Sequence, residues 1–316
     1  MFYTTNQIIE SVEARTLAPT GQPTYQNSDY VRFANEELQI KIVPDIMTIR
    51  EDFFLRVLNY SITNAQASYT LPERTLGNTL KDLFYIDQNG NRYPISRVNI
   101  NDIPLNTAAT IYPQTFYMKG DQVVLVPTPT ATVGTMEAWY YERPSELVLT
   151  EACGQITSIA LNTPLAGQTT YTVNADVSSY ATLDFVSGTS PFRDYSIDVT
   201  PVSATSTTVV VTNTDVDSES GSLLPVVGDW ICEAQTSPIP MVPQEFHPLL
   251  AELVAGRVVQ GLGDAQKLEA INANVGMMRQ NMLNMIANRI EQKQEVIVNR
   301  YGLTRASGYG WTIWNR

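Results

Sequence analysis

The chain has 316 residues, a formal net charge of −12 and a hydrophobic fraction of 43%, so it is long enough for one large or two ordinary domains with a sizeable core. Its mean hydropathy of −0.12 and the lack of a long apolar run exclude a membrane-spanning chain. The only histidine is His247, which argues against histidine-based metal sites and catalytic triads.

The N-terminal region is expected to form two helices. Residues 4–7 (TTNQ) give a capping-box pattern ahead of apolar residues, which predicts a helix over about residues 5–16 and no signal peptide. A second helix is expected to start at Asn27 or Ser28, with apolar residues at helical spacing on one face. Pro44 either kinks that helix or opens a new segment.

Short β-like runs occupy the next ninety or so residues. Hairpin turns are expected at Asn89-Gly90 and at residues 119–121 (KGD). The expected strands cover residues 55–62, 80–86, 92–100, 115–118, 122–126 and 135–141. Several short strands at this spacing predict a small barrel or sandwich.

Residues 151–237 have a different composition, rich in Thr, Ser, Val, Gly and Asp, and predict an inserted β-sandwich-like domain. Its expected strands include residues 171–173, 197–202 and 207–212. The flanking residues, 1–150 and 238–316, are expected to form one core of helices and β structure. The fold class is therefore predicted to be α+β, with a helical core from the N- and C-terminal helices.

The charge of the chain is concentrated in this insertion. Residues 151–240 hold ten acidic residues and one basic residue, Arg193, whereas residues 251–316 hold eight basic and five acidic ones. Because binding to phosphates requires Lys and Arg, the acidic part is not expected to grip DNA, but it suits a passage along which DNA slides. Cys153 and Cys232 lie near the two ends of the insertion. So few thiols favour a reducing compartment, and a disulfide between these two is the open alternative.

Helices return after Pro243. A break is expected at residues 261–263 (GLG), and Asp264 can cap the helix that follows, whose apolar residues continue to Ile290. This helix carries a methionine-rich stretch. Since methionine adapts to irregular surfaces, we name Met278, Met282 and Met285 as candidates for a subunit interface, with an ordinary core face as the alternative.

The C-terminal tail, from about residue 293 to residue 316, is expected to dock on a partner. Exposed apolar clusters usually mark contacts. Burying the large apolar side chains of the tail is expected to contribute about 10 kcal/mol in total. Ordering the backbone costs about 1–2 kcal/mol for each tail residue. Because the summed cost is the larger, the tail should order only against another chain. The candidate docking residues are Tyr301, Tyr309, Trp311, Ile313 and Trp314.

No pattern of catalytic or cofactor-binding residues appears. A complete nucleotide-binding glycine loop and a Gly-x-Ser-x-Gly elbow are both absent from the sequence, and His247 is interpreted as a capping or packing residue. The alternating acids Asp215, Asp217 and Glu219 lack the glycine and distal glutamate of an EF-hand loop and predict a solvated loop. We therefore predict no catalytic, cofactor or metal site, and no enzyme.

The order of several short motifs resembles the head-to-tail adaptor, or connector, proteins of tailed bacteriophages, especially short-tailed ones. The resemblance covers about residues 1–150 and 238–316. The motifs are REDFF at 50–54, YTLP at 69–72, YPI at 93–95, FYMKGDQVVLVPTP at 116–129, WYYERP at 139–144, PQEFHPLLA at 243–251 and the pair Gly263-Asp264.

This resemblance implies a virion structural protein that assembles in the host cytoplasm and lies at the head–tail interface. Copies would form a ring, commonly a dodecamer, beneath the portal protein. The ring would extend the DNA channel, let genomic DNA pass without sequence-specific binding, and dock tail or nozzle proteins. The helical faces around residues 28–52 and 245–292 are the candidates for contacts between copies.

Two other functional classes remain as alternatives to the adaptor. One is a tail or capsid decoration protein whose β domain binds a host glycan, which predicts a monomer or trimer that exposes that domain. The other is a depolymerase-type hydrolase, although the insertion holds scattered aspartates without a recognisable catalytic pair.

Overall fold

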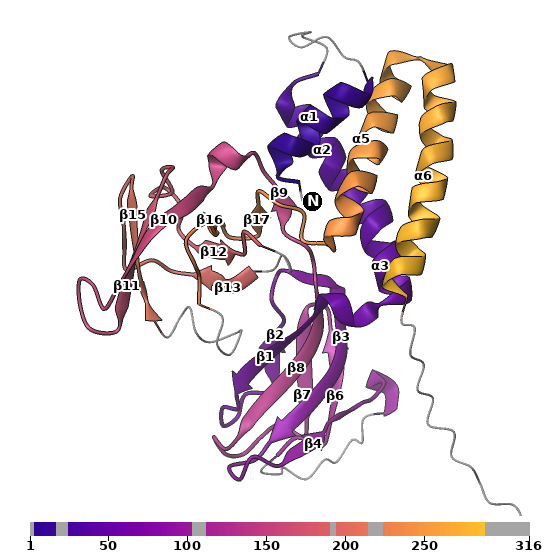
Figure 1. Cartoon of the computed structure of the whole chain (residues 1–316). Helices are drawn as coiled ribbons and strands as arrows, with labels where there is room; N and C mark the ends of the chain where they lie inside the picture. Colours follow the sequence, from indigo (N-terminus) through magenta and orange to yellow (C-terminus); the bar gives the residue numbers. More distant parts are fainter. Residues whose placement is uncertain (1–2, 17–24, 103–111, 190–193, 214–223, 288–316) are drawn as a thin grey trace, which may run out of the picture. The chain divides into compact units, whose positions relative to one another are not determined.

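The computed structural model describes residues 3–16, 25–102, 112–189, 194–213 and 224–287. The chain divides at residue 286, and the fold described here is that of the first unit, Met1–Ile286. Helices and strands both contribute substantially to it, which confirms the predicted α+β class (Figure 1).

The helices come from the two ends of this unit. They are α1 (Thr5–Thr16), α2 (Asn27–Glu37), the π-helical η1 (Leu38–Ile42), α3 (Val43–Ile49), α5 (His247–Leu262) and α6 (Ala265–Ile286). Short 3₁₀ turns are η2 (Glu51–Phe54), η3 (Ile100–Asp102), η4 (Thr150–Ala152) and η5 (Gln244–Phe246).

The first helix has the predicted bounds and the predicted cap. The Thr4 N–H donates to Gln7 Oε1 at 3.0 Å, and the Gln7 N–H donates to Thr4 Oγ1 at 3.4 Å. These two bonds satisfy backbone donors that a helix start leaves without partners. The Thr5 N–H also donates to the Pro238 carbonyl at 2.8 Å, so α1 is tied to the segment that leads into the C-terminal helices.

Pro44 lies at the start of α3, within a run of helical backbone that begins in α2. The chain runs from α2 through the π-helical turn η1 into α3, and Pro44 lies in the first turn of α3. The residues that join these elements all keep right-handed helical dihedrals, and the wider π-helical turn just before Pro44 accommodates a residue that has no N–H to donate.

Helix α5 is the centre of the helical part. It contacts α1, α2 and α6, and Leu250, Val254 and Val258 are completely buried. A helix that is apolar on all sides is expected to be enclosed by others. The same hydrophobic cluster includes Val12 of α1 and Leu38 of η1, so elements more than 200 residues apart share one core.

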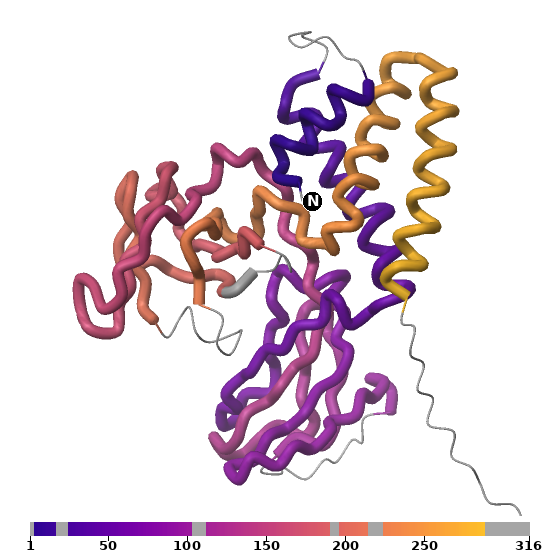
Figure 2. The backbone as a smooth tube through the Cα atoms, viewed as in Figure 1, coloured from indigo at the N-terminus to yellow at the C-terminus, as the bar shows by residue number. Residues whose placement is uncertain are grey.

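The break between α5 and α6 is the predicted one. Gly263 has a left-handed φ of 78°, and its N–H donates to the carbonyls of Val259 and Gln260. The Lys267 N–H donates to Asp264 Oδ1 at 3.1 Å, which confirms the predicted cap. The two helices then run side by side as a hairpin, coloured orange and yellow in Figure 2.

The first β region consists of two four-stranded sheets, ordered β1-β8-β3-β4 and β2-β7-β6-β5. The strands are β1 (Leu55–Ser61), β2 (Ser68–Thr70), β3 (Thr75–Ile86), β4 (Arg92–Pro94), β5 (Ser96–Arg97), β6 (Thr115–Lys119), β7 (Gln122–Val126) and β8 (Thr135–Glu142). Leu83 and Met136 from one sheet pack with Phe116 and Leu125 from the other, so both sheets enclose one hydrophobic cluster. We call this region the β core.

Most strands of the β core lie where the sequence predicts them, but β2 was not predicted and β3 begins five residues before the expected start at 80. The Asn89-Gly90 turn forms, with Gly90 at φ 81° and the Asp87 carboxylate accepting backbone N–H bonds from Asn89 and Asn91. The single strand expected over residues 92–100 was wrong. Instead β4 ends at Pro94, β5 joins the other sheet parallel to β6, and η3 follows. Pro94 has no N–H to continue the ladder.

The second β region is one seven-stranded sheet, ordered β13-β12-β16-β10-β11-β15-β14. Its strands are β10 (Gly154–Leu161), β11 (Gln168–Val173), β12 (Leu183–Val186), β13 (Asp194–Val199), β14 (Ser203–Ala204), β15 (Thr208–Thr212) and β16 (Trp230–Glu233). Tyr171, Phe185 and Val209 from three of these strands pack in one cluster, so the sheet must curl around its own core. We call it the inserted sheet.

The sequence predicts the inserted sheet only in part. Strand β11 contains the expected residues, β15 begins one residue after the expected start at 207, and β13 lies three residues before the expected 197–202. Strands β10, β12, β14 and β16 were not predicted. A small parallel pair, β9 (Glu146–Leu147) with β17 (Thr236–Ser237), stands where the chain enters and leaves this region. The division into an adaptor core and an inserted domain at residues 151 and 237 stays a prediction.

Candidate interaction surfaces

The three candidate methionines lie in different surroundings on α6. Met278 and Met282 are partly buried and pack against the helical core of their own chain. Met285 is 56% exposed, and Met277, which precedes Met278 in the chain, is 62% exposed. The structure therefore separates one outward methionine from two that also serve the core, and the interface role of the three stays a prediction.

The five candidate docking residues of the tail, Tyr301, Tyr309, Trp311, Ile313 and Trp314, lie outside the described residues. So do Asp215, Asp217 and Glu219 and the end of the predicted helix at Ile290. Their expected roles stay predictions.

A buried ion cluster centred on Arg74 was not predicted from the sequence. This arginine precedes β3 in the β core and is 2% exposed. Its Nη2 donates to both carboxylate oxygens of Asp184 at 3.2 and 3.1 Å and to Asp198 Oδ1 at 2.9 Å. Its Nη1 donates to Glu142 Oε1 at 3.4 Å. One side chain thus joins the β core to strands β12 and β13 of the inserted sheet. We call this group the Arg74 junction.

Asp184 is the most enclosed member of the junction. It is completely buried in β12, and it also accepts the N–H groups of Asp198 at 2.8 Å and Gln235 at 2.7 Å. Burial raises the pKa of Asp184, while the Arg74 guanidinium and the two backbone donors act in the opposite direction. Glu142, which accepts a hydrogen bond from Arg74, also accepts one from a second guanidinium: Arg56 Nε donates to its Oε2 at 2.6 Å.

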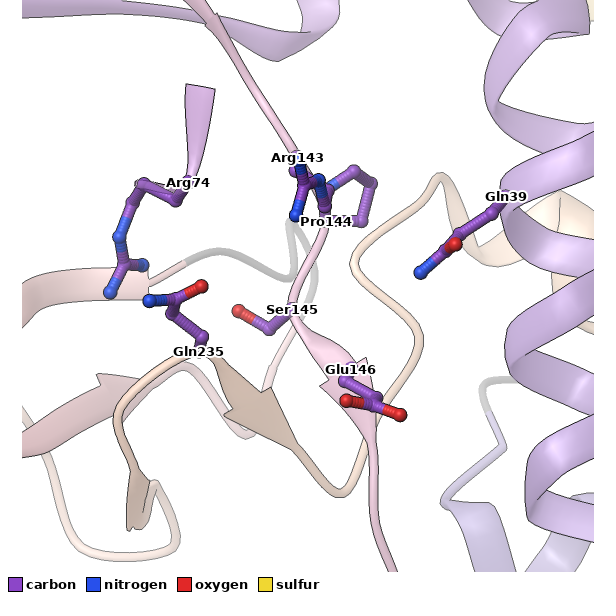
Figure 3. A pocket seen from close by; sticks show the side chains of 7 residues that line it. All are labelled: Gln39, Arg74, Arg143, Pro144, Ser145, Glu146 and Gln235. Carbon is purple, nitrogen blue, oxygen red and sulfur yellow. The ribbon is translucent and has the colours of Figure 1, made fainter. Parts of the chain in front are cut away.

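A small polar cavity of about 100 Å³ adjoins the junction (Figure 3). The side chains of Arg74, Ser145 and Gln235 point toward one another there, and Gln39 lies across from them on the helical side. Ligand pockets for small molecules usually have volumes of about 300–1,000 Å³, so this cavity is too small for an ordinary organic substrate.

The acidic residues of the insertion do not all face outward. Asp184 and Asp229 are buried, and Asp229 accepts the backbone N–H groups of Gly188 and Val226 at 2.8 Å each. These two carboxylates therefore hold the inserted sheet together. Asp176 and Glu233 are exposed, and the role of the acidic residues in a DNA passage stays a prediction.

The helical part has its own buried acid, Glu37 at the end of α2. Its side chain is completely buried, yet both cationic partners reach it from the surface. Lys41 Nζ lies 2.6 Å from Oε2 with a side chain that is 48% exposed. Arg257 of α5 donates to Oε1 with a side chain that is 38% exposed.

His247 has the packing role that the sequence predicts. It is completely buried at the start of α5, where Nδ1 accepts the Tyr3 N–H at 3.0 Å and Nε2 faces the Val242 carbonyl at 3.3 Å. This arrangement requires a neutral ring protonated on Nε2. Burial lowers the pKa of His247 to about 4, which keeps the ring neutral at ordinary pH.

The two cysteines do not form a disulfide. Cys153 and Cys232 are both buried in a small apolar cluster with Val186 and Ile239, and both retain their thiols. Within the parts of the chain that the structure describes, no three His, Cys, Asp or Glu side chains are grouped to hold a metal ion. Among the described helices, none is both long and apolar enough to cross a bilayer.

The family of the chain is shown by a match over its N-terminal half. Residues 3–164 match the SU10 adaptor protein family, and this range is just over half of the chain. The chain belongs to this family. It is a family of phage adaptor proteins, so the predicted relation to phage head–tail adaptors is confirmed at that level, whereas the restriction to short-tailed phages stays a prediction. No curated protein matches the chain.

The start of the matched range coincides with the first helix, whereas its end does not coincide with the end of the β core. It begins two residues before α1, covers the β core, and continues through β10 into the inserted sheet. The resemblance was expected over about residues 1–150 and 238–316; the match extends beyond the first of these ranges and does not include the second, which stays a prediction. Membership in an adaptor family indicates a structural role in the virion and association with portal and tail proteins.

Proposed function

We propose that copies of this protein form a ring beneath the phage portal, extend the DNA channel and provide the docking surface for tail or nozzle proteins. The observation that carries the proposal is the family match over residues 3–164. Twelve copies are the expected number, short-tailed phages are the expected source, and assembly takes place in the host cytoplasm.

The tail from about residue 293 is proposed to dock on the portal or on a neighbouring copy. Its aromatic residues and its net positive charge support this role, because the chain as a whole is acidic and offers complementary surfaces. Met278, Met282 and Met285 are proposed to lie near the contact between copies. The exposure of Met285 supports a contact for that residue more directly than for the other two.

DNA is proposed to pass through the ring without sequence-specific binding. The insertion contributes Arg193 as its only basic residue, whereas DNA binding depends on several cations facing the phosphates. We also propose that the protein catalyses no reaction, on the basis of its structural family and of a sequence with no recognised catalytic motif.

Asymmetric image reconstruction of the phage particle tests the ring directly. We expect a ring of copies between the portal and the tail, with the helical part at the contacts between copies. A monomer or trimer displayed on the capsid or tail surface would contradict the proposal and favour the decoration protein.

The docking role of the tail is tested by Trp311→Ala with Trp314→Ala. We expect heads that fill with DNA but fail to retain the adaptor, because most energy at a contact comes from a few large aromatic residues. The matched control changes Thr312→Ala and Asn315→Ala in the same segment. Equal loss of adaptor from both variants, measured by the protein content of purified heads, would remove the special role of the tryptophans.

A further inference from the structure

The chain holds only two cysteines, and the inserted sheet brings them together. Strand β10 pairs antiparallel with β16, and Gly154 lies opposite Ile231 (Figure 1). Cys153 directly precedes β10 and has extended backbone, with φ −120° and ψ 145°. Cys232 follows Ile231 within β16. One further step along the same register therefore places Cys153 opposite Cys232.

Both thiols lie on the same face of the inserted sheet. Successive side chains of a strand point to opposite faces. Ile231 and Phe185 belong to the hydrophobic cluster around which the sheet curls. Cys153, Cys232 and Ile239 belong to a second cluster. The two sulfurs therefore lie on the opposite face, which the segment leading to α5 covers.

The hydrogen bonds of the ladder show which kind of pair the cysteines form. The Ile156 N–H donates to the Asp229 carbonyl at 2.8 Å, and hydrogen-bonded and non-hydrogen-bonded positions alternate along an antiparallel ladder. Three steps back from Ile156, Cys153 and Cys232 occupy a non-hydrogen-bonded position. Its Cα atoms are typically about 4.5 Å apart, and a disulfide joins Cα atoms about 4.4–6.8 Å apart. The pair is therefore close enough to be bridged.

Burial favours pairing within one chain over other reactions of these thiols. Cys153 is 1% exposed and Cys232 is 0% exposed. A second copy would have to open the sheet to reach either sulfur, whereas the two cysteines of one chain are already neighbours. Among the described residues, no His, Asp or Glu joins them in a group of three that could hold a metal ion.

We infer that Cys153 and Cys232 form an oxidation site: both are thiols in a reducing medium, and they form one intrachain disulfide in an oxidising one. The oxidant is a small disulfide such as oxidised glutathione. Because both sulfurs are buried, the reaction requires the adjoining ends of β10 and β16 to open.

The oxidation proceeds by two thiol–disulfide exchanges. The thiolate of one cysteine attacks the small disulfide, forms a mixed disulfide and releases one small thiol. The second cysteine then attacks the mixed disulfide, which forms the Sγ–Sγ bond and releases the second small thiol. Two electrons pass from the cysteine sulfurs to the small disulfide, and the two cysteine protons leave with the small thiols.

The bridge would join the chain where it enters the inserted sheet to the point where it leaves. A disulfide stabilises a fold mainly by restricting the unfolded chain, and more so when it closes a long loop. Cys232 also lies opposite Asp184 of β12, the residue that binds Arg74, so the bridge secures the strand next to the Arg74 junction. The timing in the phage, with thiols in the cell and a disulfide after release, rests on the proposed assembly in the host cytoplasm.

Equilibration of the full chain with reduced and oxidised glutathione tests the pairing. The ratio of bridged to thiol chains is measured by alkylation and mass spectrometry, in buffer and in urea, starting from both the reduced and the oxidised chain. We expect the ratio to be at least about tenfold higher in the folded chain, because folding holds the two sulfurs at bridging distance. An equal or lower ratio in the folded chain, or bridges between two copies, would overturn the inference.

A matched variant moves one thiol to the other face of the sheet. Cys232→Val with Glu233→Cys closes a loop of nearly the same length, but position 233 points away from Cys153. Its bridged fraction should be no higher in the folded chain than in urea, and urea unfolding curves establish that the variant folds. A gain on folding equal to that of the wild type would show that the register does not position the pair.

Purified particles test the timing separately from the ring. Peptide mapping without reduction is expected to show the Cys153–Cys232 bridge in released particles and thiols in infected cells alkylated before lysis. Thiols that persist in released particles would overturn the inference for the virion. Reconstruction of the particle decides the ring, and its outcome does not change the result of the glutathione equilibrium.

Discussion

Glu37 in the helical part and Asp184 in the inserted sheet are both completely buried, but their cationic partners differ in exposure. Lys41 and Arg257 bring their charges to Glu37 from half-exposed positions, whereas Arg74 is itself 2% exposed. Lys41 and Arg257 can therefore turn toward water when Glu37 is lost, whereas loss of Arg74 leaves the carboxylate of Asp184 completely buried. The same kind of ion pair is therefore expected to have different energetic consequences in the two regions.

The largest decrease in the free energy of unfolding is expected for Arg74→Met. This change leaves Asp184 buried without its cation, and removing one partner of a buried ion pair typically costs about 3–5 kcal/mol. The measurement is the free energy of unfolding in urea. Arg74→Met combined with Asp184→Asn should recover part of the loss, because the uncompensated charge is gone. A double variant that is as unstable as the sum of both single variants would show that the pair is not coupled.

A pH-dependent effect of nearly the same size is expected from His247. Its folded-state pKa of about 4 lies below the ordinary value of 6.5, so the unfolded chain binds the proton first as the pH falls. Stability is therefore unaffected by this group above pH 6.5 and decreases as the pH falls to about 4. The total loss is about 3.5 kcal/mol, since each pKa unit corresponds to about 1.4 kcal/mol.

Unfolding free energies measured across that pH range, for the wild type and for His247→Gln, check this contribution. Glutamine has a donor and an acceptor but does not titrate, so the variant should lose less stability between pH 6.5 and 4. Identical pH profiles would assign the loss to carboxylates elsewhere.

The smallest decrease in the free energy of unfolding is expected for Glu37→Gln. The amide retains the shape of the side chain, and Lys41 and Arg257 can turn toward water, so the loss should be about 1–2 kcal/mol, the usual cost of weakened hydrogen bonds to charged groups. Urea unfolding of this variant beside Arg74→Met makes the comparison direct. Equal losses from both would mean that partner exposure does not decide the cost.

Part of the surface arrangement could be predicted from the sequence. The periodicity of α6 indicated an apolar face and methionines suited to a contact, and Asp264 correctly marked the helix start. Which methionine faces outward could not be predicted, because a helix with apolar residues over more than one face does not reveal which face meets the core. Packing against α5 and α3 settled that Met277 and Met285 are exposed.

The sequence by itself determined the features that depend on near neighbours: the capped helix over Thr5–Thr16, the Asn89-Gly90 turn, the glycine end of α5 and the α+β class. Only the tertiary structure decided which distant residues meet. Arg74 and Asp184 are 110 positions apart, and Asn35 exchanges two hydrogen bonds with the backbone of Leu147, 112 positions away. Local patterns record backbone preferences, whereas contacts over such separations depend on strand order and register, which no short stretch of sequence specifies.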